Sequence, residues 1–438
     1  MTLTTPITVI RGRFLDIQKT VSQAAEIADQ VRYLEDGVLI TEQGKIRWFG
    51  TWNDAQDHLP ANVDIQHYPE QLIIPGMIDT HIHFPQTEMV GAYGEQLLSW
   101  LNTYTFPTEI QFKDKTYASE IAKFFVNELL KNGTTTALVF CTVHPESVNA
   151  LFEAAEQHQM RLIAGKVMMD RHAPEALCDS VDSSYDDSKA LIEKWHGQGR
   201  ALYAITPRFA PTSTPEQLER AGQLKAEHPD VYVHTHLSEN KDEIAWVKDL
   251  FPAQKGYLDV YHHYGLTGQR SVFAHCVHLE DDEWQCMHET DSAIAFCPTS
   301  NLFLGSGLFP LKKTWQQQVK VGLGTDIGAG TSFSLLQTVN EAYKVQQLQG
   351  DKLSAYESLY HATLGGAKAL YLDDKLGNFN VGKEADFVVL NLQPTALQQL
   401  RQSRAKSLED SLFALFTMGD DRNVEATYIY GQKAYSQN

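Results

Sequence analysis

Short β-rich apolar runs alternate with longer amphipathic segments from residue 73 to residue 326 of this 438-residue chain. The segments between the runs carry apolar residues at helical spacing. Strands that alternate with helices pair in parallel with the helices outside, and eight such units over about 300 residues predict an α/β fold, a TIM-like (β/α)8 barrel. The eight predicted strands cover residues 73–83, 134–143, 161–169, 202–209, 231–239, 271–279, 292–301 and 319–326.

The two ends of the chain have a different pattern, in which alternating apolar runs are broken by Gly and Asp turns. We predict that residues 1–72 and 374–438 together form a small β-sandwich domain, and that residues 73–373 form the barrel domain. The connection at 84–113 is long for a βα loop, so we expect it to be a lid, a contact between subunits, or both.

Composition excludes several classes of partner. The net charge of −19 opposes binding to nucleic acid and to anionic membranes, which rely on clustered Lys and Arg. The chain has neither a signal-peptide pattern nor an apolar run of about 18 residues that could span a bilayer, and we expect a cytoplasmic protein. Its five cysteines show no C-x-x-C spacing, which predicts free thiols rather than a disulfide framework.

His81 and His83 lie two residues apart at the end of the first predicted barrel strand, in "DTHIH". Side chains at i and i+2 of a strand point the same way, and neutral imidazole is a common metal ligand. Either residue alone is more often a hydrogen-bonded core histidine. Because the carboxyl ends of barrel strands meet at one mouth, polar side chains at later strand ends favour a metal site. These side chains are His234, His236, Glu239, His275 and Asp326.

The set "PGMIDTHIH", "HLSE", "AHC", "GTD" and "GKEADFVVL" resembles the mononuclear deaminase branch of the amidohydrolase superfamily over nearly the whole chain. More narrowly, "THIHFPQ", "LSWLNTYTFPTE", "TPRF", "HLSENKDE", "LGTDIGAG" and "LGGAKALYLDDKLGNF" resemble the guanine deaminases. This resemblance implies the hydrolysis of guanine, a small purine base, to xanthine and ammonia.

The resemblance also implies roles for single residues. It makes Glu239 the proton shuttle, Asp326 and His275 its catalytic partners, and His234 a deeper residue that is not a ligand. It implies one Zn²⁺ per chain, with Fe²⁺ possible because imidazole and carboxylate suit both ions, and a homodimer. The implied metal ligands are His81, His83, His236 and Asp326. The implied purine contacts are His83, Gln86, Arg208, Phe209, His236, Glu239 and Asp326.

The chemistry of these residue types agrees with that function. Displacing an aromatic amine at neutral pH requires a strong nucleophile, and bound Zn²⁺ lowers the pKa of water to about 7. A ring nitrogen must gain a proton before ammonia leaves, which requires a carboxylate relay such as Glu239. The Arg208 fork and the Gln86 amide suit the polar edge of a purine. Spacing alone supports only a hydrolase of an amino-heterocycle.

Two alternatives stay open. The chain could act on cytosine, an adenine-like ring or a triazine, or it could be a non-catalytic scaffold related to these enzymes, although its complete ligand set opposes the second. Lys166 is expected to be structural or ion-paired, because it lies on the third predicted strand rather than the fourth, where some relatives bridge two metals. The glycines of "GLGTDIGAG" do not have dinucleotide-binding spacing, and "YHHY" at 261–264 is expected to be a helix surface.

Overall fold

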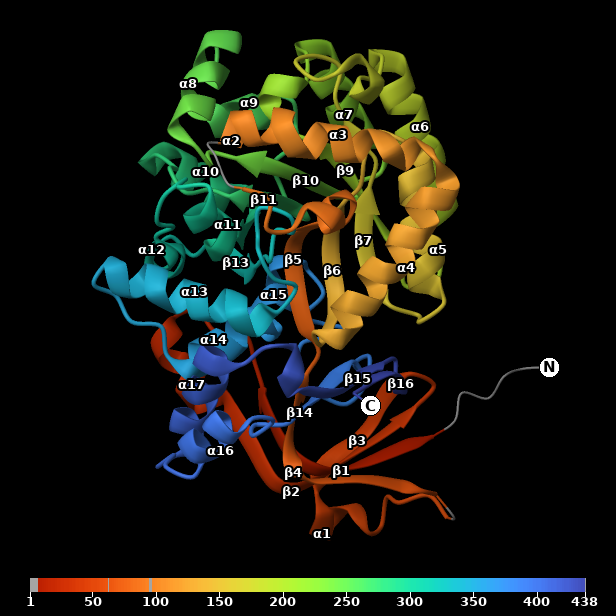
Figure 1. Cartoon of the computed structure of the whole chain (residues 1–438), viewed down its shortest axis with the longest axis vertical. Helices are drawn as coiled ribbons and strands as arrows, with labels where there is room; N and C mark the ends of the chain where they lie inside the picture. Colours follow the sequence, from red (N-terminus) through yellow and green to blue (C-terminus); the bar gives the residue numbers. More distant parts are fainter. Residues whose placement is uncertain (1–6, 62, 94–96, 438) are drawn as a thin grey trace, which may run out of the picture.

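Eight parallel strands form the central sheet of the protein, seen here in a computed structural model that describes residues 7–61, 63–93 and 97–437 (Figure 1). Each strand pairs with its sequence neighbour, and the short strand β8 (Val167–Met168) pairs with β9. The predicted (β/α)8 barrel is confirmed. Its strands are β5 (Met77–His83), β6 (Thr134–Phe140), β7 (Arg161–Gly165), β9 (Leu202–Pro207), β10 (Tyr232–Leu237), β11 (Ser271–His275), β12 (Ala293–Phe296) and β13 (Lys320–Leu323).

Polar contacts join the last strand to the first. The Thr80 hydroxyl donates to the carbonyl of Leu323 at 3.0 Å, and the amide of Asp326 donates to the carbonyl of His81 at 2.9 Å. These bonds bring the chain that follows β13 against the carboxyl end of β5. The end of the eighth strand and the paired histidines therefore share one region of the barrel mouth.

Helices cover the outside of the barrel, and side chains cap several of them. Asp114 accepts hydrogen bonds from first-turn amides of α4, and Thr214 does so for α7, in which Pro215 occupies the first position. The helices between residues 115 and 369 are α4 (Lys115–Lys131), α5 (Pro145–Glu156), α6 (Val181–Trp195), α7 (Pro215–Glu227), α8 (Lys241–Leu250), α9 (Tyr257–His263), α10 (Asp281–Glu289), α11 (Pro298–Phe303), α12 (Leu311–Gln316), α13 (Leu335–Leu348), α14 (Ala355–Ala362) and α15 (Leu364–Ala369).

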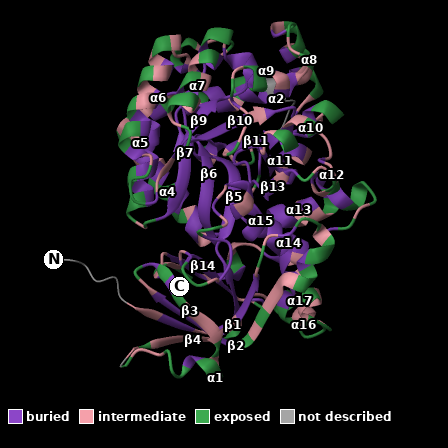
Figure 2. Cartoon of the chain, turned by 180° about the vertical axis from the view of Figure 1, so that it is seen from behind, coloured by how far each residue is buried: buried purple, intermediate pink, exposed green. Residues whose placement is uncertain are grey.

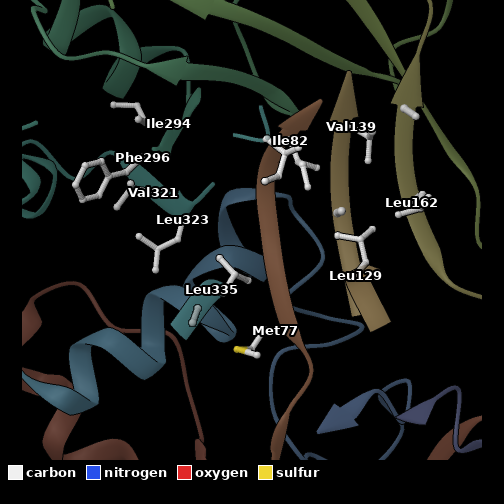
Figure 3. Close-up of a cluster of buried hydrophobic side chains, with 14 of the residues drawn as sticks. Met77, Ile82, Leu129, Val139, Leu162, Ile294, Phe296, Val321, Leu323 and Leu335 are labelled. Atoms are coloured by element: carbon white, nitrogen blue, oxygen red, sulfur yellow. The ribbon is translucent and has the colours of Figure 1, made fainter. Parts of the chain in front are cut away.

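Alternate strand residues serve two different cores. Ile82, Val139 and Leu162 pack toward the helices in the cluster that Figure 3 shows, together with Leu129 of α4 and Leu335 of α13. Leu138 and Ile163, the strand neighbours of Val139 and Leu162, point into the barrel, in a second cluster that also contains Ile78 and Val272. Figure 2 shows the strands of the barrel almost entirely buried and the helices around them exposed along their outer faces. Because Ile82 faces the helices, His81 and His83 face the barrel interior.

Strands from both ends of the chain form one mixed sheet below the barrel (Figure 1). Its strands lie in the order β16, β15, β14, β4, β1, β2 and β3. Helix α1 (Trp52–Ala55) follows β3, and α16 (Ala396–Gln402) and α17 (Leu408–Met418) lie between β14 and β15. The strands are β1 (Thr8–Ile17), β2 (Val31–Glu42), β3 (Lys45–Thr51), β4 (Ile65–Pro75), β14 (Phe387–Leu390), β15 (Val424–Ile429) and β16 (Gln432–Ser436).

The run predicted as the first barrel strand is divided between the two sheets. Ile73, Ile74 and Pro75 belong to β4 and pair with β14, and Gly76 separates them from β5. A side chain at Gly76 would overlap Thr135, with a Cβ only 2.0 Å from its hydroxyl oxygen. The chain therefore needs glycine where it crosses from one sheet to the other.

The long connection after β5 covers the barrel mouth. It contains α2 (Leu97–Trp100), a π-helical turn (Leu101–Thr105) and α3 (Phe106–Glu109), which lie across the end of the barrel farthest from the terminal sheet (Figure 1). This is the position that the prediction of a lid requires. Among the helices of the described residues, none is long and apolar enough to cross a membrane.

Candidate active site

Three imidazoles meet at the carboxyl ends of β5 and β10. The Nε2 atom of His83 lies 3.2 Å from Nε2 of His81 and 3.2 Å from Nε2 of His236. All three side chains are largely or fully buried, and His81 is fully inaccessible. Three ring nitrogens that converge at this spacing can share one cation.

Asp326, just beyond β13, adds a carboxylate to this group. Its Oδ1 atom lies 3.2 Å from Nε2 of His81 and 3.4 Å from Nε2 of His83. The residue has a φ of 52°, in the left-handed region, which turns the chain sharply after the strand. Residues other than glycine rarely adopt this backbone conformation unless the surroundings enforce it. Here the amide of Asp326 is bonded to the carbonyl of His81.

The second nitrogen of each of these imidazoles has a partner. Nδ1 of His236 lies 2.7 Å from the carbonyl oxygen of Arg208, which can only accept, so Nδ1 carries the proton. Nδ1 of His81 lies 2.8 Å from Nε2 of His234. Burial lowers the pKa of His81, His83 and His236 well below its usual value, so the rings are neutral. With its Nδ1 protonated, the neutral ring of His236 directs its Nε2 lone pair inward, as metal ligation requires. Nδ1 of His83 lies 3.1 Å from the amide nitrogen of Gln86.

Glu239 and His275 lie beside this group. Nε2 of His275 is 3.5 Å from Glu239 Oε2 and 3.8 Å from Asp326 Oδ2, and its Nδ1 faces the amide oxygen of Asn301 at 2.9 Å. The Ser306 hydroxyl donates to Glu239 Oε1 at 3.1 Å. Burial raises the pKa of Glu239. Burial alone would lower the pKa of His275, but the nearby carboxylates of Glu239 and Asp326 outweigh it, and the pKa is raised. Glu239, His275 and Asp326 can therefore exchange protons within the site.

A cavity opens onto these groups. Gln86, Arg208 and Phe209, which the sequence analysis assigned to the purine, all line it. Trp100 and Leu101 come from the covering connection, so the cavity has apolar walls and a few convergent polar groups, as small-molecule sites do. Its lining also includes His83, His236, Glu239, Glu243, His275, Leu304, Asp326 and Ala329.

Glu109, at the end of α3, is a residue of the site that the sequence patterns did not indicate. Arg208 Nη1 donates to Glu109 Oε2 at 2.7 Å, and Gln86 Nε2 donates to Glu109 Oε1 at 3.2 Å. Glu109 is the carboxylate of the stretch "TFPTE", but nothing in the sequence indicates which distant residue it will contact. Asn301 and Ser306 were missed for the same reason.

The other sequence patterns have structural explanations. Lys166 is fully buried and bonds to Asp179, as expected of an ion-paired residue. At Gly324 a Cβ would lie 2.9 Å from that of His81, so this glycine allows close approach to β5. The prediction of a helix surface at "YHHY" is wrong for Tyr261, which is fully buried and donates to the carbonyl of His236 at 2.9 Å.

Comparisons with known proteins agree with this geometry. Residues 72–434 match the amidohydrolase family. The guanine deaminase of Escherichia coli (strain K12) is 62% identical over 429 residues, 98% of each chain. The solved E. coli guanine deaminase has a TM-score of 0.96 and 60% identity, covering 99% of this chain and 100% of that one. A guanine deaminase from C. acetobutylicum, solved with guanine in its active site, has a TM-score of 0.88 and 30% identity, covering 98% and 100%. The chain therefore belongs to the amidohydrolase family, among its guanine deaminases.

Proposed function

We propose that this enzyme hydrolyses guanine to xanthine and ammonia at the barrel mouth. The observation that carries the proposal is the 62% identity to the E. coli guanine deaminase over 98% of both chains. The site supports it independently, because a cavity lined by Gln86 and Arg208 adjoins buried groups that can activate water and move protons. Geometry alone would fit several amino-heterocycles, and the identity favours guanine among them.

A divalent ion fits the inner group. The proposed ligands are Nε2 of His81, His83 and His236 and a carboxylate oxygen of Asp326, a nitrogen and oxygen set that suits Zn²⁺ and also Fe²⁺. We infer one Zn²⁺ per chain, because Lys166 is paired with Asp179 away from this group. Such an ion supplies a Lewis acid that makes water a competent nucleophile near pH 7.

Proton transfer falls to Glu239, His275 and Asp326. Water adds at the ring carbon that bears the amine, and Asp326 Oδ2, which faces His275, can accept a proton from that water. A buried carboxyl with a raised pKa, as in Glu239, can hold a proton and deliver it to a ring nitrogen. The C–N bond then breaks as the amine takes the proton that Asp326 accepted and leaves as neutral ammonia, while the added hydroxyl returns a proton to Glu239 and becomes the second ring carbonyl.

The purine lies between the covering connection and the strand ends in this proposal. Arg208 and Gln86 bond to its carbonyl and nitrogen edge, and the backbone of Phe209 lies beside it. The inner groups His83, His236, Glu239 and Asp326 line the same cavity, so the amine-bearing carbon can approach them. A homodimer, a cytoplasmic location and the division between domains at residues 72–73 and 373–374 stay predictions that rest on the sequence.

A turnover assay with a substrate panel tests the proposed function. Purified protein should convert guanine to xanthine with release of one ammonia, followed by ultraviolet absorbance and ammonia detection. We expect kcat/KM for guanine to exceed that for cytosine, adenine or a triazine by about 10²-fold or more, the discrimination available to a site that hydrogen-bonds its substrate. Treatment with a chelator should abolish turnover, and added Zn²⁺ should restore it. Faster turnover of any other ring than of guanine would contradict the proposal.

A further inference from the structure

One buried carboxylate holds both side chains that we assign to the purine edge. Glu109 Oε2 accepts from Arg208 Nη1 at 2.7 Å, and Glu109 Oε1 accepts from Gln86 Nε2 at 3.2 Å. The side chains of Arg208 and Glu109 are 3% and 1% exposed, so this ion pair is shielded from water. Buried charges depend strongly on such partners, because an unpaired one is costly.

The contacts around the pair fix the two purine-binding groups. The guanidinium of Arg208 also stands over the ring of Phe106, 5.5 Å from its centroid, so α3 holds it through two residues. The amide oxygen of Gln86 accepts from the backbone N–H of Gly328 at 3.0 Å, while its nitrogen donates to Glu109. The Gln86 amide is therefore held at both ends, and its orientation is not free to reverse.

Glu109 also determines the charge that the cavity presents. Within the described part of the chain, Arg208 forms its ion pair with Glu109. The carboxylates of Glu239 and Asp326 face His275 instead. A guanidinium whose charge is balanced still offers hydrogen-bond donors, but it attracts an anion less than an unbalanced one does. The cavity edge at Arg208 therefore favours a neutral ring over an anionic one.

This distinction matters for the substrate and product of the proposed reaction. Deamination replaces the amine with a second ring carbonyl, which withdraws electrons from the neighbouring N–H groups. Xanthine therefore loses a ring proton more readily than guanine does. A site with an unbalanced arginine would retain the xanthine anion and inhibit the next turnover.

We propose that Glu109 is a positioning and specificity residue, which balances Arg208 and orients Gln86 so that the site binds neutral guanine and releases anionic xanthine. The proposal rests on guanine deamination as the reaction. It concerns binding of the ring rather than chemistry at the amine-bearing carbon, so it predicts an effect on KM and on product inhibition more than on kcat.

The test is Glu109→Gln, which keeps the shape of the side chain and removes its charge. We expect KM for guanine to rise about 10- to 100-fold with a smaller change in kcat, because the charge-assisted bond from Arg208 to Glu109 no longer positions the guanidinium for the ring. We expect xanthine to bind the variant at least about 10-fold more tightly than wild type once it is ionised, and its affinity to rise with pH across the pKa of xanthine. Titration of xanthine into the metal-loaded protein measures this without turnover.

Two controls separate charge from structure. Glu88→Gln removes an exposed carboxylate of the same covering connection, one that bonds to Tyr117, and should leave xanthine affinity unchanged at every pH. Glu109→Asp keeps the charge and shortens the reach, so it should raise KM without tightening xanthine binding at high pH. The other titratable groups of the cavity, namely His83, His236, Glu239, Glu243, His275 and Asp326, are the same in every variant.

The outcomes distinguish this inference from the proposed function. An inactive wild type would overturn guanine deamination, whereas an active wild type with unchanged xanthine affinity in Glu109→Gln would overturn the role of Glu109 alone. If Glu109→Gln fails to fold, the double variant with Arg208→Gln removes both charges. A folded double variant whose xanthine affinity does not rise with pH would support the inference, and one that also fails to fold, or whose affinity still rises, would overturn it.

Discussion

Residues behind the cavity hold the side chains that line it in place. His236 is held from two sides, since its Nδ1 donates to the carbonyl of Arg208 and its own carbonyl accepts from Tyr261 at 2.9 Å. The Tyr261 hydroxyl also accepts from the amide of Ala210 at 2.9 Å and from the hydroxyl of Thr235 at 3.0 Å. One phenol thus joins the ends of two strands at the site.

Tyr261→Phe should therefore destabilise the protein without removing its core packing. The substitution leaves the Ala210 amide and the His236 carbonyl without this buried partner, which costs about 1–3 kcal/mol. Thermal or denaturant unfolding measures the loss, with Tyr93→Phe as a control because Tyr93 is 74% exposed. Equal stability of the two variants would show that the Tyr261 hydroxyl contributes nothing.

Site residues were predictable where their chemical type and their position at a strand end both pointed to the site. His81 and His83 share a strand face, and Asp326 ends the eighth strand, so their convergence follows from the barrel itself. Glu109 and Tyr261 could not be predicted, because their partners lie about 100 and 25 residues away and their roles depend on tertiary approach.

At the scale of elements, the eight barrel strands were predictable because each is a short apolar run buried on both faces. The crossing at Gly76 was not, since the apolar runs on its two sides read as one strand over 73–83. The connection at 84–113 was recognised only by its length. Its contribution to the cavity through Trp100 and Leu101 depends on where its short helices pack.

At the scale of the whole molecule, ion pairs join the barrel to the terminal sheet. Arg161 and Arg200, at the bottom of the barrel, both bind Glu384, and Arg200 also binds Asp386 next to β14. Burial raises the pKa of Glu384, but the two arginines outweigh burial and lower it below its usual value of 4.5. The lowered pKa means that the ionised carboxylate stabilises the fold.

The sign of this shift predicts the pH dependence of stability. The contribution of Glu384 is complete above the unfolded value of 4.5 and is lost as the pH falls through the lower folded value. Glu384→Gln should cost about 2–4 kcal/mol at neutral pH, because it leaves two arginines underpaired, and the difference from wild type should shrink in acid. Unfolding midpoints across pH measure this, with Glu42→Gln as a control from an exposed pair. A difference that grows in acid would contradict the assignment.

Glu239→Gln isolates proton transfer from metal binding and from binding of the ring, because glutamine keeps the shape of the side chain and cannot release a proton. We expect the variant to retain its metal by elemental analysis and to bind xanthine like wild type, while kcat for guanine falls about 10²- to 10⁴-fold, the usual contribution of a positioned acid or base. Turnover of guanine at a near wild-type rate would show that Glu239 moves no proton. Loss of the metal would show that Glu239 is a ligand instead.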